Sequence, residues 1–422
     1  HVLGYRDIDG AGRGGVEQSL NYLIEGVPGK RKLVRDAVGR IVEVSFDPDS
    51  EPKRFDAIQL TLDLTIQMFA EKALDEIVDE WKPAGACAIA MDPNSGDVLA
   101  MASRPTYSLS DMSHVPDNAW KNQAISIVYE PGSTFKPFIV AEALQSGLIK
   151  QDEIFYCENG EYRMGPRILH DHHAFSELSV TDILVKSSNI GMAKIGERLT
   201  NSGLYNATVK FGFGRPTGID LPGELSGILR PLKKWNVYST GSIPMGHELA
   251  VTPLQLLAAQ SALSNGGRLI TPRILRGVQG QRSDSARSFH AALEDPTTIV
   301  RPTVSSDVAR WVIEKPMSDV VSRGTGRRAQ IPGYSVFGKT GTAQKMDPEN
   351  GGYSKTLHCS SFICGAPAYN PKVLVLIVVD EPKSGSTHYG GTIAAPAAAK
   401  ILSRSLMYLR IPPDQEHRTA GR

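Results

Sequence analysis

Residues 130–137 read EPGSTFKP, and this stretch decides how the rest of the chain is interpreted. Pro131 and Gly132 precede Ser133, and helix-forming residues follow, so the sequence predicts that Ser133 lies in the first turn of a helix. Lys136 comes three positions later, so the two side chains fall on the same face of that helix and are expected to reach hydrogen-bond distance of each other. A hydroxyl beside an amine at a helix N-terminus, where the partial positive charge favours a developing alkoxide, is typical of a serine nucleophile.

Two more motifs follow in order, Ser-Ser-Asn at residues 187–189 and Lys-Thr-Gly-Thr at residues 339–342. A single short motif is a weak signal, because Ser-x-x-Lys also occurs at residues 50–53, where Pro52 argues against a helix interior. Lys-Thr-Gly occurs once in the chain. The order of the three motifs, rather than any one of them, indicates a serine acyl-transfer site.

The three motifs, with their extended forms at residues 186–189 and 338–344, resemble the penicillin-recognising signature of class B penicillin-binding proteins, the monofunctional D,D-transpeptidases of wall synthesis. The resemblance covers nearly the whole chain. Further similar segments lie at residues 246–255, 324–326 and 389–391. The division-type branch is the most similar, because residues 12–17 and 26–29 resemble the end of its N-terminal pedestal domain.

The resemblance implies a role for each residue of the first two motifs. Ser133 is expected to be the acylated nucleophile and Lys136 its general base. Ser187 is expected to relay a proton to the leaving amine, and Asn189 to orient Lys136 and the substrate amide. A lysine that acts as a base near neutral pH must be buried or lie beside another cation, and Lys339 is the candidate for that cation.

The third motif is expected to bind the substrate. Lys339 would recognise its terminal carboxylate, assisted by the hydroxyls of Thr340 and Thr342. Backbone N–H groups of Ser133 and Thr342 would form an oxyanion hole, and Gly341 permits the close approach this requires. The remaining residues predicted to bind substrate are Tyr389 and Gly390. His388 is a departure, because division-type members often carry an aromatic residue there.

These roles predict a reaction. Ser133 attacks the penultimate D-Ala carbonyl of a peptidoglycan stem peptide and expels D-Ala, and an amine of a neighbouring stem then resolves the acyl-enzyme. A β-lactam mimics D-Ala-D-Ala and should acylate Ser133. No cofactor and no metal site is predicted. The resemblance also implies a membrane-embedded glycosyltransferase and division proteins as partners. It places the domain in the bacterial cell envelope, outside the cytoplasmic membrane and anchored to it by an N-terminal helix missing from this sequence.

Two other kinds of function remain open. A serine β-lactamase or a D,D-carboxypeptidase shares the motifs but transfers the acyl group to water; no clear Glu-x-x-Leu-Asn segment lies between the second and third motifs. A β-lactam sensor or an inactive wall-binding scaffold is the other alternative. The intact motifs argue against an inactive protein.

Composition limits the class of ligand. The chain has 422 residues, 46 basic and 45 acidic, for a net charge of +1, which gives no long-range field for nucleic acid. No apolar run approaches the ~18 residues that span a bilayer.

The predicted fold is α+β, a penicillin-binding and β-lactamase-like antiparallel sheet flanked by helices. Apolar spacing predicts a helix over residues 63–81, and paired apolar runs predict hairpins over 86–101 and 360–379. A last helix is expected at about 393–409. Three parts are predicted: the remnant of the pedestal domain at 1–54, the transpeptidase domain at 55–411, and a polar tail at 412–422.

One cluster suggests a different chemistry. His170, Asp171, His172 and His173 follow Cys157, so a zinc site is conceivable, but the spacing matches no standard motif and an exposed polar loop is the preferred interpretation. The four cysteines are expected to be buried thiols, and Cys359 and Cys364 are not expected to bridge, because five residues along a strand put their side chains on opposite faces.

Overall fold

The structure is a computed structural model, and it describes residues 1–24, 30–46, 57–279, 300–347, 351–385 and 387–415. These residues form two compact units. The first consists of residues 1–61, 220–222 and 274–298, and the second contains the rest. The predicted boundary between residues 54 and 55 lies outside the described residues, so the proposed division into pedestal and transpeptidase domains stays a prediction.

The first unit is built from short antiparallel pairs: β1 with β2, β3 with β4, and β5 with β15. Its elements are β1 (Tyr5–Arg6), β2 (Gly12–Arg13), α1 (Gly15–Ser19), α2 (Asn21–Ile24), β3 (Arg31–Arg35), β4 (Ile41–Phe46), β5 (Ala57–Leu60) and β15 (Leu275–Gln279).

The second unit is organised around one five-stranded antiparallel sheet with the order β17-β18-β19-β6-β7. Its strands are β17 (Phe337–Met346), β18 (Tyr353–Ala366), β19 (Val373–Asp380), β6 (Gly85–Met91) and β7 (Val98–Arg104). Both predicted hairpins are confirmed, and β19 pairs with β6, so strands from opposite ends of the chain close the sheet. The predicted α+β fold is confirmed.

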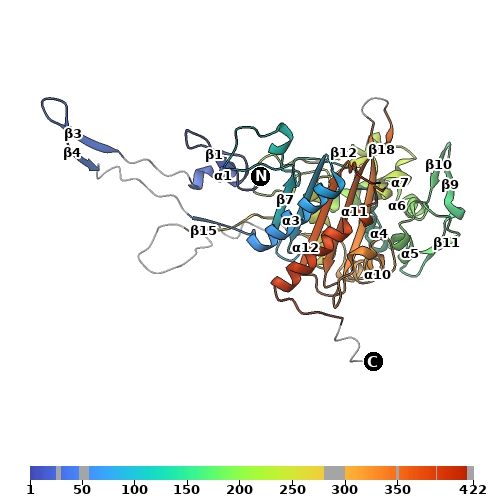
Figure 1. The fold of residues 1–422 in the computed structure, drawn as a ribbon. Coiled ribbons are helices and arrows are strands. Elements are labelled where there is room, and N and C mark those ends of the chain that lie inside the picture. Colours follow the sequence, from blue (N-terminus) through green and yellow to red (C-terminus); the bar gives the residue numbers. More distant parts are fainter. Residues whose placement is uncertain (25–29, 47–56, 280–299, 348–350, 386, 416–422) are drawn as a thin grey trace. The chain divides into compact units, whose positions relative to one another are not determined.

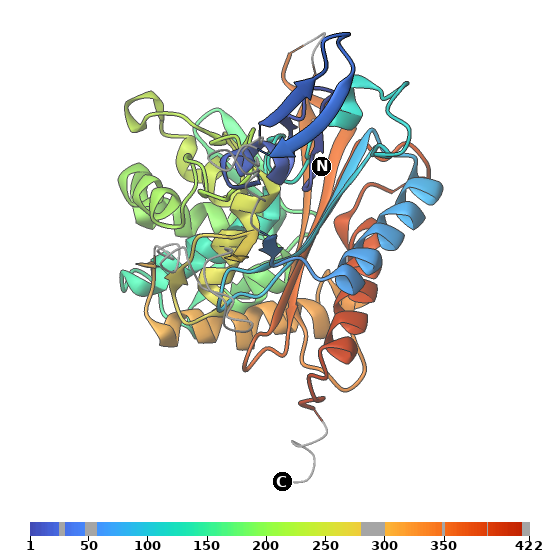
Figure 2. The ribbon, with the colours of Figure 1, turned by 90° about the vertical axis from the view of Figure 1, so that its left-hand side faces the viewer.

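Helices cover both faces of this sheet (Figures 1 and 2). On one face, α3 (Leu64–Trp81) and α12 (Ala395–Tyr408) lie side by side over alternate strand residues such as Ala88, Phe362 and Ile377. The predicted helix at 63–81 is confirmed, and Asp63 caps it by accepting from the N–H groups of Thr65 and Ile66 at 2.9 and 3.1 Å. The sheet is therefore buried on both sides, which explains its nearly continuous apolar runs.

Most of the remaining helices and the small strand pairs of this unit lie on the opposite face. These helices are α4 (Lys136–Gln145), α5 (Val180–Lys186), α6 (Asn189–Lys210), α7 (Ser239–Ser242), α8 (Pro253–Ser264) and α9 (Ser306–Val312). Two short helices, α10 (Ser318–Ser322) and α11 (Gly390–Ile393), each contribute a residue to the cluster under α3 and α12. The strands are β8 (Ile154–Tyr156), β9 (Glu161–Met164), β10 (Arg167–His170), β11 (Glu177–Ser179), β12 (Ile228–Leu229), β13 (Leu249–Ala250), β14 (Arg268–Leu269) and β16 (Arg301–Pro302).

Two further predictions can be compared with the structure. All four cysteines are free and buried, as predicted. The first residues of the predicted polar tail are attached, because the side chain of Asp414 accepts from the N–H of Ser335 at 2.7 Å and its own N–H donates to the carbonyl of Gly333. Residues 416–422 lie outside the described part of the chain. No helix in the described residues is long and apolar enough to span a membrane.

Candidate active site

Ser133 lies in a single 3-10 turn, η3 (Gly132–Phe135), that leads directly into α4. The turn is fixed from within, because the hydroxyl of Thr134 donates to the carbonyl of Pro131 at 2.7 Å. It is fixed from behind by the buried ring of Phe135, which contacts that of Phe138 at 5.8 Å between centroids. Ser133 therefore lies at the start of a helix, as predicted, and its turn is packed against the buried aromatic core.

The hydroxyl of Ser187 contacts three of the other predicted site residues. Its hydroxyl donates to Oγ of Ser133 at 2.9 Å and accepts from the Nζ atoms of Lys136 at 3.2 Å and Lys339 at 3.0 Å. Ser187 ends α5 with φ 59°, in the left-handed region that costs a non-glycine residue energy. This backbone turn sends its side chain between the two lysines, and residues from three distant segments meet there.

Lys136 is fully buried, and its Nζ is bound by the segment that contains the second motif. Besides Ser187 Oγ, it donates to the carbonyl oxygens of Ser187 at 2.7 Å and Ser188 at 3.3 Å and to Oδ1 of Asn189 at 2.9 Å. Burial lowers the pKa of Lys136 to about 7, and the nearby carboxylate of Asp171 opposes that shift. The neutral amine required of a base is therefore accessible near neutral pH.

Lys339, on β17, is also fully buried and donates to its neighbour's carbonyl, that of Thr340, at 3.3 Å. Burial and the charge of Lys136 hold the pKa of Lys339 well below its usual value. The two ammonium groups share one hydroxyl, so each disfavours the charge on the other and the pair titrates as a unit. The structure thus brings the two lysines to one hydroxyl, and the role of Lys339 as the opposing cation stays a prediction.

The route from Ser133 to Lys136 differs from the one expected. The i, i+3 spacing suggested direct contact, whereas in the described part of the chain Lys136 reaches Ser133 through the hydroxyl of Ser187. The reason is that the carbonyl oxygens of residues 187 and 188 and the amide of Asn189 hold Nζ on the side of α5 and α6. Ser187 thus lies where a proton leaving Ser133 would first pass.

Asp171 is a site residue that the sequence analysis assigned to an exposed loop. Its carboxylate accepts from the hydroxyl of Ser188 at 2.6 Å, from the N–H of Ile190 at 3.1 Å and from the N–H of Asn189. The two N–H groups belong to the first turn of α6 and have no acceptor within the helix, and a carboxylate is favourable at a helix N-terminus. Asp171 therefore fixes the Ser-Ser-Asn segment. The sequence pattern did not point to this contact, because Asp171 and Asn189 are 18 positions apart.

The third motif lies on β17, next to the nucleophile turn. Oγ1 of Thr340 lies 2.8 Å from Oγ1 of Thr325, in the Gly324–Gly326 segment, and Oγ1 of Thr342 accepts from the N–H of Gly390 at 3.1 Å. A Cβ at Gly341 would lie 2.9 Å from Cγ2 of Thr134 and 2.3 Å from a side-chain oxygen of the neighbouring strand, so β17 presses against the nucleophile turn. Glycine is required here for close approach rather than for an unusual φ.

Gly390 and Tyr389 lie beside the same strand. A Cβ at Gly390 would lie 2.4 Å from the carbonyl oxygen of Gly341, so only glycine fits between α11 and β17. The side chain of Tyr389 is 48% exposed, and its ring forms an edge contact with His172 at 5.9 Å. All ten predicted site residues therefore belong to one region of the second unit.

A second group of polar side chains holds the nucleophile turn from the other direction. The carboxylate of Glu130 binds Nδ1 of His247 at 2.7 Å, the hydroxyl of Tyr353 at 3.0 Å and the N–H of Glu248 at 2.9 Å. Burial and Glu130 together raise the pKa of Tyr353. The N–H of Gly132 also donates to the carbonyl oxygen of Gly246 at 3.1 Å. These contacts join two of the stretches that resemble the family, residues 130–137 and 246–255. The sequence alone did not predict that Glu130 binds His247.

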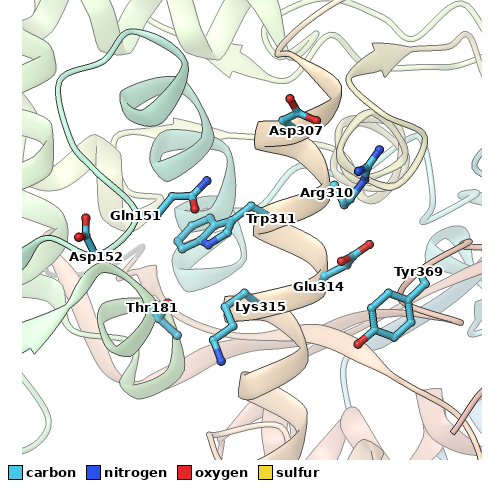
Figure 3. Close-up of a pocket in the computed structure, with 9 residues that line it drawn as sticks. All are labelled: Gln151, Asp152, Thr181, Asp307, Arg310, Trp311, Glu314, Lys315 and Tyr369. Carbon is cyan, nitrogen blue, oxygen red and sulfur yellow. The ribbon is translucent and has the colours of Figure 1, made fainter. Parts of the chain in front are cut away.

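Figure 3 shows a separate hollow of about 640 Å³ where Trp311, Glu314 and Lys315 project from one helical segment. It contains none of the predicted site residues. Among the described residues, no group of three or more His, Cys, Asp or Glu side chains is placed to hold a metal ion. The carboxylate of Asp171, the one acid of the suspected zinc cluster, is instead committed to the N-terminus of α6.

Comparison with known proteins agrees with this geometry. Residues 86–403 match the family described as the penicillin binding protein transpeptidase domain. The chain is 35% identical over 421 residues to stage V sporulation protein D of Bacillus subtilis, an alignment that covers 98% of this chain and 63% of that protein. It is 30% identical over 414 residues to the peptidoglycan D,D-transpeptidase FtsI of Escherichia coli, covering 98% of this chain and 66% of FtsI.

A solved structure shares the fold over nearly the whole chain. Penicillin-binding protein 3 from Mycobacterium tuberculosis, solved in complex with aztreonam, superposes with a TM-score of 0.85 at 29% sequence identity, covering 98% of this chain and 89% of that one. Since the family match spans most of the chain and the relatives align from end to end with it, the assignment does not rest on the motifs alone. The chain therefore belongs to the class B penicillin-binding proteins.

Proposed function

We propose that the protein is a peptidoglycan D,D-transpeptidase that cross-links stem peptides through an acyl-enzyme on Ser133. The observation that carries this proposal is the hydroxyl of Ser187, hydrogen-bonded at once to Ser133 and to the buried Lys136 and Lys339. The substrate class comes from the relatives, because FtsI is named a peptidoglycan D,D-transpeptidase.

In the acylation step, the hydroxyl of Ser133 attacks the carbonyl of the penultimate D-Ala. Its proton passes to Ser187, and Ser187 gives its own proton to the neutral amine of Lys136. The tetrahedral intermediate then collapses, the peptide C–N bond breaks, and the leaving D-Ala amine takes a proton back through Ser187. Asn189 holds the amine of Lys136 in place through this exchange.

The two lysines have complementary roles in this proposal. At neutral pH their mutual repulsion through Ser187 disfavours a positive charge on both. A substrate carboxylate arriving beside Lys339 favours charge there, and the repulsion then favours a neutral Lys136. Substrate binding would thus prepare the base, and the hydroxyls of Thr340 and Thr342 would complete the carboxylate site.

Transfer of the acyl group to an amine rather than to water separates this function from that of a β-lactamase or a carboxypeptidase. A lactamase requires a base that activates water. The carboxylate nearest the Ser-Ser-Asn segment, Asp171, already accepts three hydrogen bonds. We therefore expect the acyl-enzyme to persist until an amine arrives, and β-lactams to act as inhibitors.

A partition assay tests the function. A peptide thioester that mimics the stem terminus is incubated with the chain and a D-amino acid as acceptor amine, and aminolysis and hydrolysis products are quantified. The wild type should form mainly the aminolysis product, Ser133→Ala should form neither, and Ser50→Ala, in the second Ser-x-x-Lys sequence, should match the wild type. Hydrolysis alone at high acceptor concentration would favour a carboxypeptidase or lactamase instead.

We further propose that the protein serves septal wall synthesis in the bacterial cell envelope, outside the cytoplasmic membrane, with division proteins and a membrane-embedded glycosyltransferase as partners. The likeness to FtsI supports this branch. The first 54 residues would then be the end of a pedestal domain. The chain spans 63% of the length of stage V sporulation protein D and 66% of that of FtsI. In this proposal, regions of the kind that those relatives have beyond the aligned part contribute to the partnerships.

A further inference from the structure

One helical segment of the second unit has two contrasting faces. Helix α9 continues into η7 (Ile313–Met317), a π-helical turn that contains Pro316, and such turns are frequent at functional sites. Ala309, Val312 and Met317 are buried on one face. The other face lines the hollow of about 640 Å³ in Figure 3, and its residues recur at the spacing of one helix face. They are Asp307, Arg310, Trp311, Glu314 and Lys315.

Trp311 is the uncharged residue among the five on this face. In Figure 3 its indole projects from the helix towards the side of the hollow formed by Gln151, Asp152 and Thr181, which come from other segments. A tryptophan that served packing alone would be expected on the buried face of the helix. A ring that faces a hollow lined by polar groups is typical of a binding platform, because indole offers a flat apolar face and a donor N–H.

The polar groups around Trp311 are not committed to one another. Within the part of the chain that the structure describes, no side-chain hydrogen bond or ion pair involves Gln151, Asp152, Asp307, Arg310, Trp311 or Glu314. By contrast, Lys194 pairs with Glu158 at 2.6 Å, and Arg323 pairs with Asp182 at 2.7 Å. Several donors and acceptors therefore border one hollow without a partner among the described residues, which suits a ligand rich in hydroxyl and amide groups.

The balance of charge favours a neutral ligand. The hollow is lined by the carboxylates of Asp152, Asp307 and Glu314 and by the cations of Arg310 and Lys315. A polyanion would meet the carboxylates at close range, and a polycation would meet the two cations. A sugar meets neither penalty. Its C–H face stacks on an indole, its hydroxyls donate to carboxylates, and its ring substituents accept from amide and guanidinium groups.

The hollow continues into a second one. A neighbouring hollow of about 860 Å³ shares Glu314, Lys315 and Tyr369 with it. Each has the size of a small-molecule site, about 300–1,000 Å³. Tyr369, which lines both, is 46% exposed, so a second aromatic ring lies beside the path between them. We call the two adjoining hollows the Trp311 groove, and their combined extent suits a polymer of linked rings.

Helix α5 joins the Trp311 groove to the candidate active site. Thr181 lines the groove near the start of α5, and Ser187 ends the same helix. Their separation in the sequence corresponds to about 9 Å along a helix axis. The residues that line the groove include none of the predicted site residues. A ligand in the groove would therefore be held near Ser133 without occupying the site.

We propose that the Trp311 groove binds the glycan strand of peptidoglycan, with the indole of Trp311 stacked on an N-acetylated sugar ring. The proposal rests on the proposed function for the identity of the polymer, because stem peptides are carried on a strand of N-acetylated sugars. The carboxylates of the groove accept from sugar hydroxyls, and Gln151 and Arg310 donate to acetamido oxygens. The groove thus adds a contact to the substrate whose peptide reacts at Ser133.

The test measures the binding of chitotetraose, a neutral oligomer of N-acetylglucosamine, to the full chain by calorimetry. The wild type is titrated before and after acylation by benzylpenicillin, and the two dissociation constants should agree because the groove excludes Ser133. Trp311→Ala should raise the constant at least about tenfold, since the stacking platform is lost. Trp311→Phe keeps a flat ring and should stay within about threefold of the wild type.

Two more variants complete the test. Trp120→Ala is the matched control, because Trp120 is 39% exposed and its ring packs against Tyr107 outside the groove. Its constant should equal that of the wild type. Glu314→Gln removes a carboxylate that lines both hollows and should weaken binding about threefold. Acylation by a fluorescent penicillin reports whether each variant is folded, and Glu314→Gln with Trp311→Phe tests the groove if Trp311→Ala is not.

Four results would overturn the proposal. They are no binding of chitotetraose by a wild type that is acylated, an unchanged constant in folded Trp311→Ala, an equal loss in Trp120→Ala, and loss of binding on acylation, which would place the sugar at Ser133. Failure of the proposed function is distinguishable. A chain that binds chitotetraose through Trp311 but is not acylated would support the groove and refute the transpeptidase alone.

Discussion

The acylation rate should follow the titration of the buried lysine pair, and the neighbouring carboxylate should set its midpoint. Lys136 accepts the proton of Ser133 through Ser187 only when its amine is neutral, and burial lowers its pKa to about 7. The rate constant for acylation should therefore rise as the pH rises through about 7 and level off above it. The midpoint belongs to the Lys136–Lys339 pair rather than to one residue.

Asp171→Asn changes that midpoint in a known direction. The carboxylate of Asp171 raises the pKa of Lys136, so its removal should lower the midpoint and make the variant relatively more active on the acidic side. One charge acting through a partly buried site contributes about 1 kcal/mol. Since one pKa unit corresponds to about 1.4 kcal/mol, the expected shift is about 0.7 of a unit.

Stopped-flow acylation by a single β-lactam, measured from acidic to alkaline pH, provides the assay. Asp75→Asn is the matched control, because Asp75 is an ion-paired aspartate on α3, paired with Arg104 at 2.6 Å. Its midpoint should equal that of the wild type. A profile that is flat across neutral pH, or a midpoint that rises in Asp171→Asn, would refute the role of Lys136 as the base.

Three further substitutions test how the site is held. Asp171→Ala leaves N–H groups at the start of α6 without their acceptor, so acylation should slow and the folded state should lose about 2 kcal/mol, measured by denaturant unfolding. Gly390→Ala places a Cβ 2.4 Å from the carbonyl oxygen of Gly341, so β17 must shift; acylation should fall at least tenfold, about 1.4 kcal/mol, and an unchanged rate would contradict the geometry. Phe362→Ala should cost about 3–5 kcal/mol because the ring is fully buried in the sheet, whereas Met68→Ala, at a position 60% exposed on α3, should leave thermal unfolding nearly unchanged.

The elements with strong periodicity were predictable from the sequence. Residues 64–81 repeat their apolar side chains at helical spacing and have Asp63 as a cap, and the hairpins of the central sheet combine continuous apolar runs with turn residues. The three motifs also identified the residues around Ser187. These features depend on local spacing, which is present in any single sequence.

The supporting contacts could not be predicted in the same way. Asp171 binds Asn189 from a segment with no periodic pattern, and Glu130 binds His247 across more than a hundred residues. Such pairs follow from how loops return to the sheet, not from propensity. The indirect link between Ser133 and Lys136 is a further example, because helical spacing fixes which face a lysine shares but not which oxygens bind its Nζ.

The most direct measurement is the mass of the chain after incubation with a fluorescent penicillin, followed over hours and mapped to a peptide. We expect one adduct on the peptide that contains Ser133, persistent in the wild type and absent in Ser133→Ala. An adduct on another serine, or its rapid loss to hydrolysed penicillin, would contradict a transpeptidase whose nucleophile is Ser133.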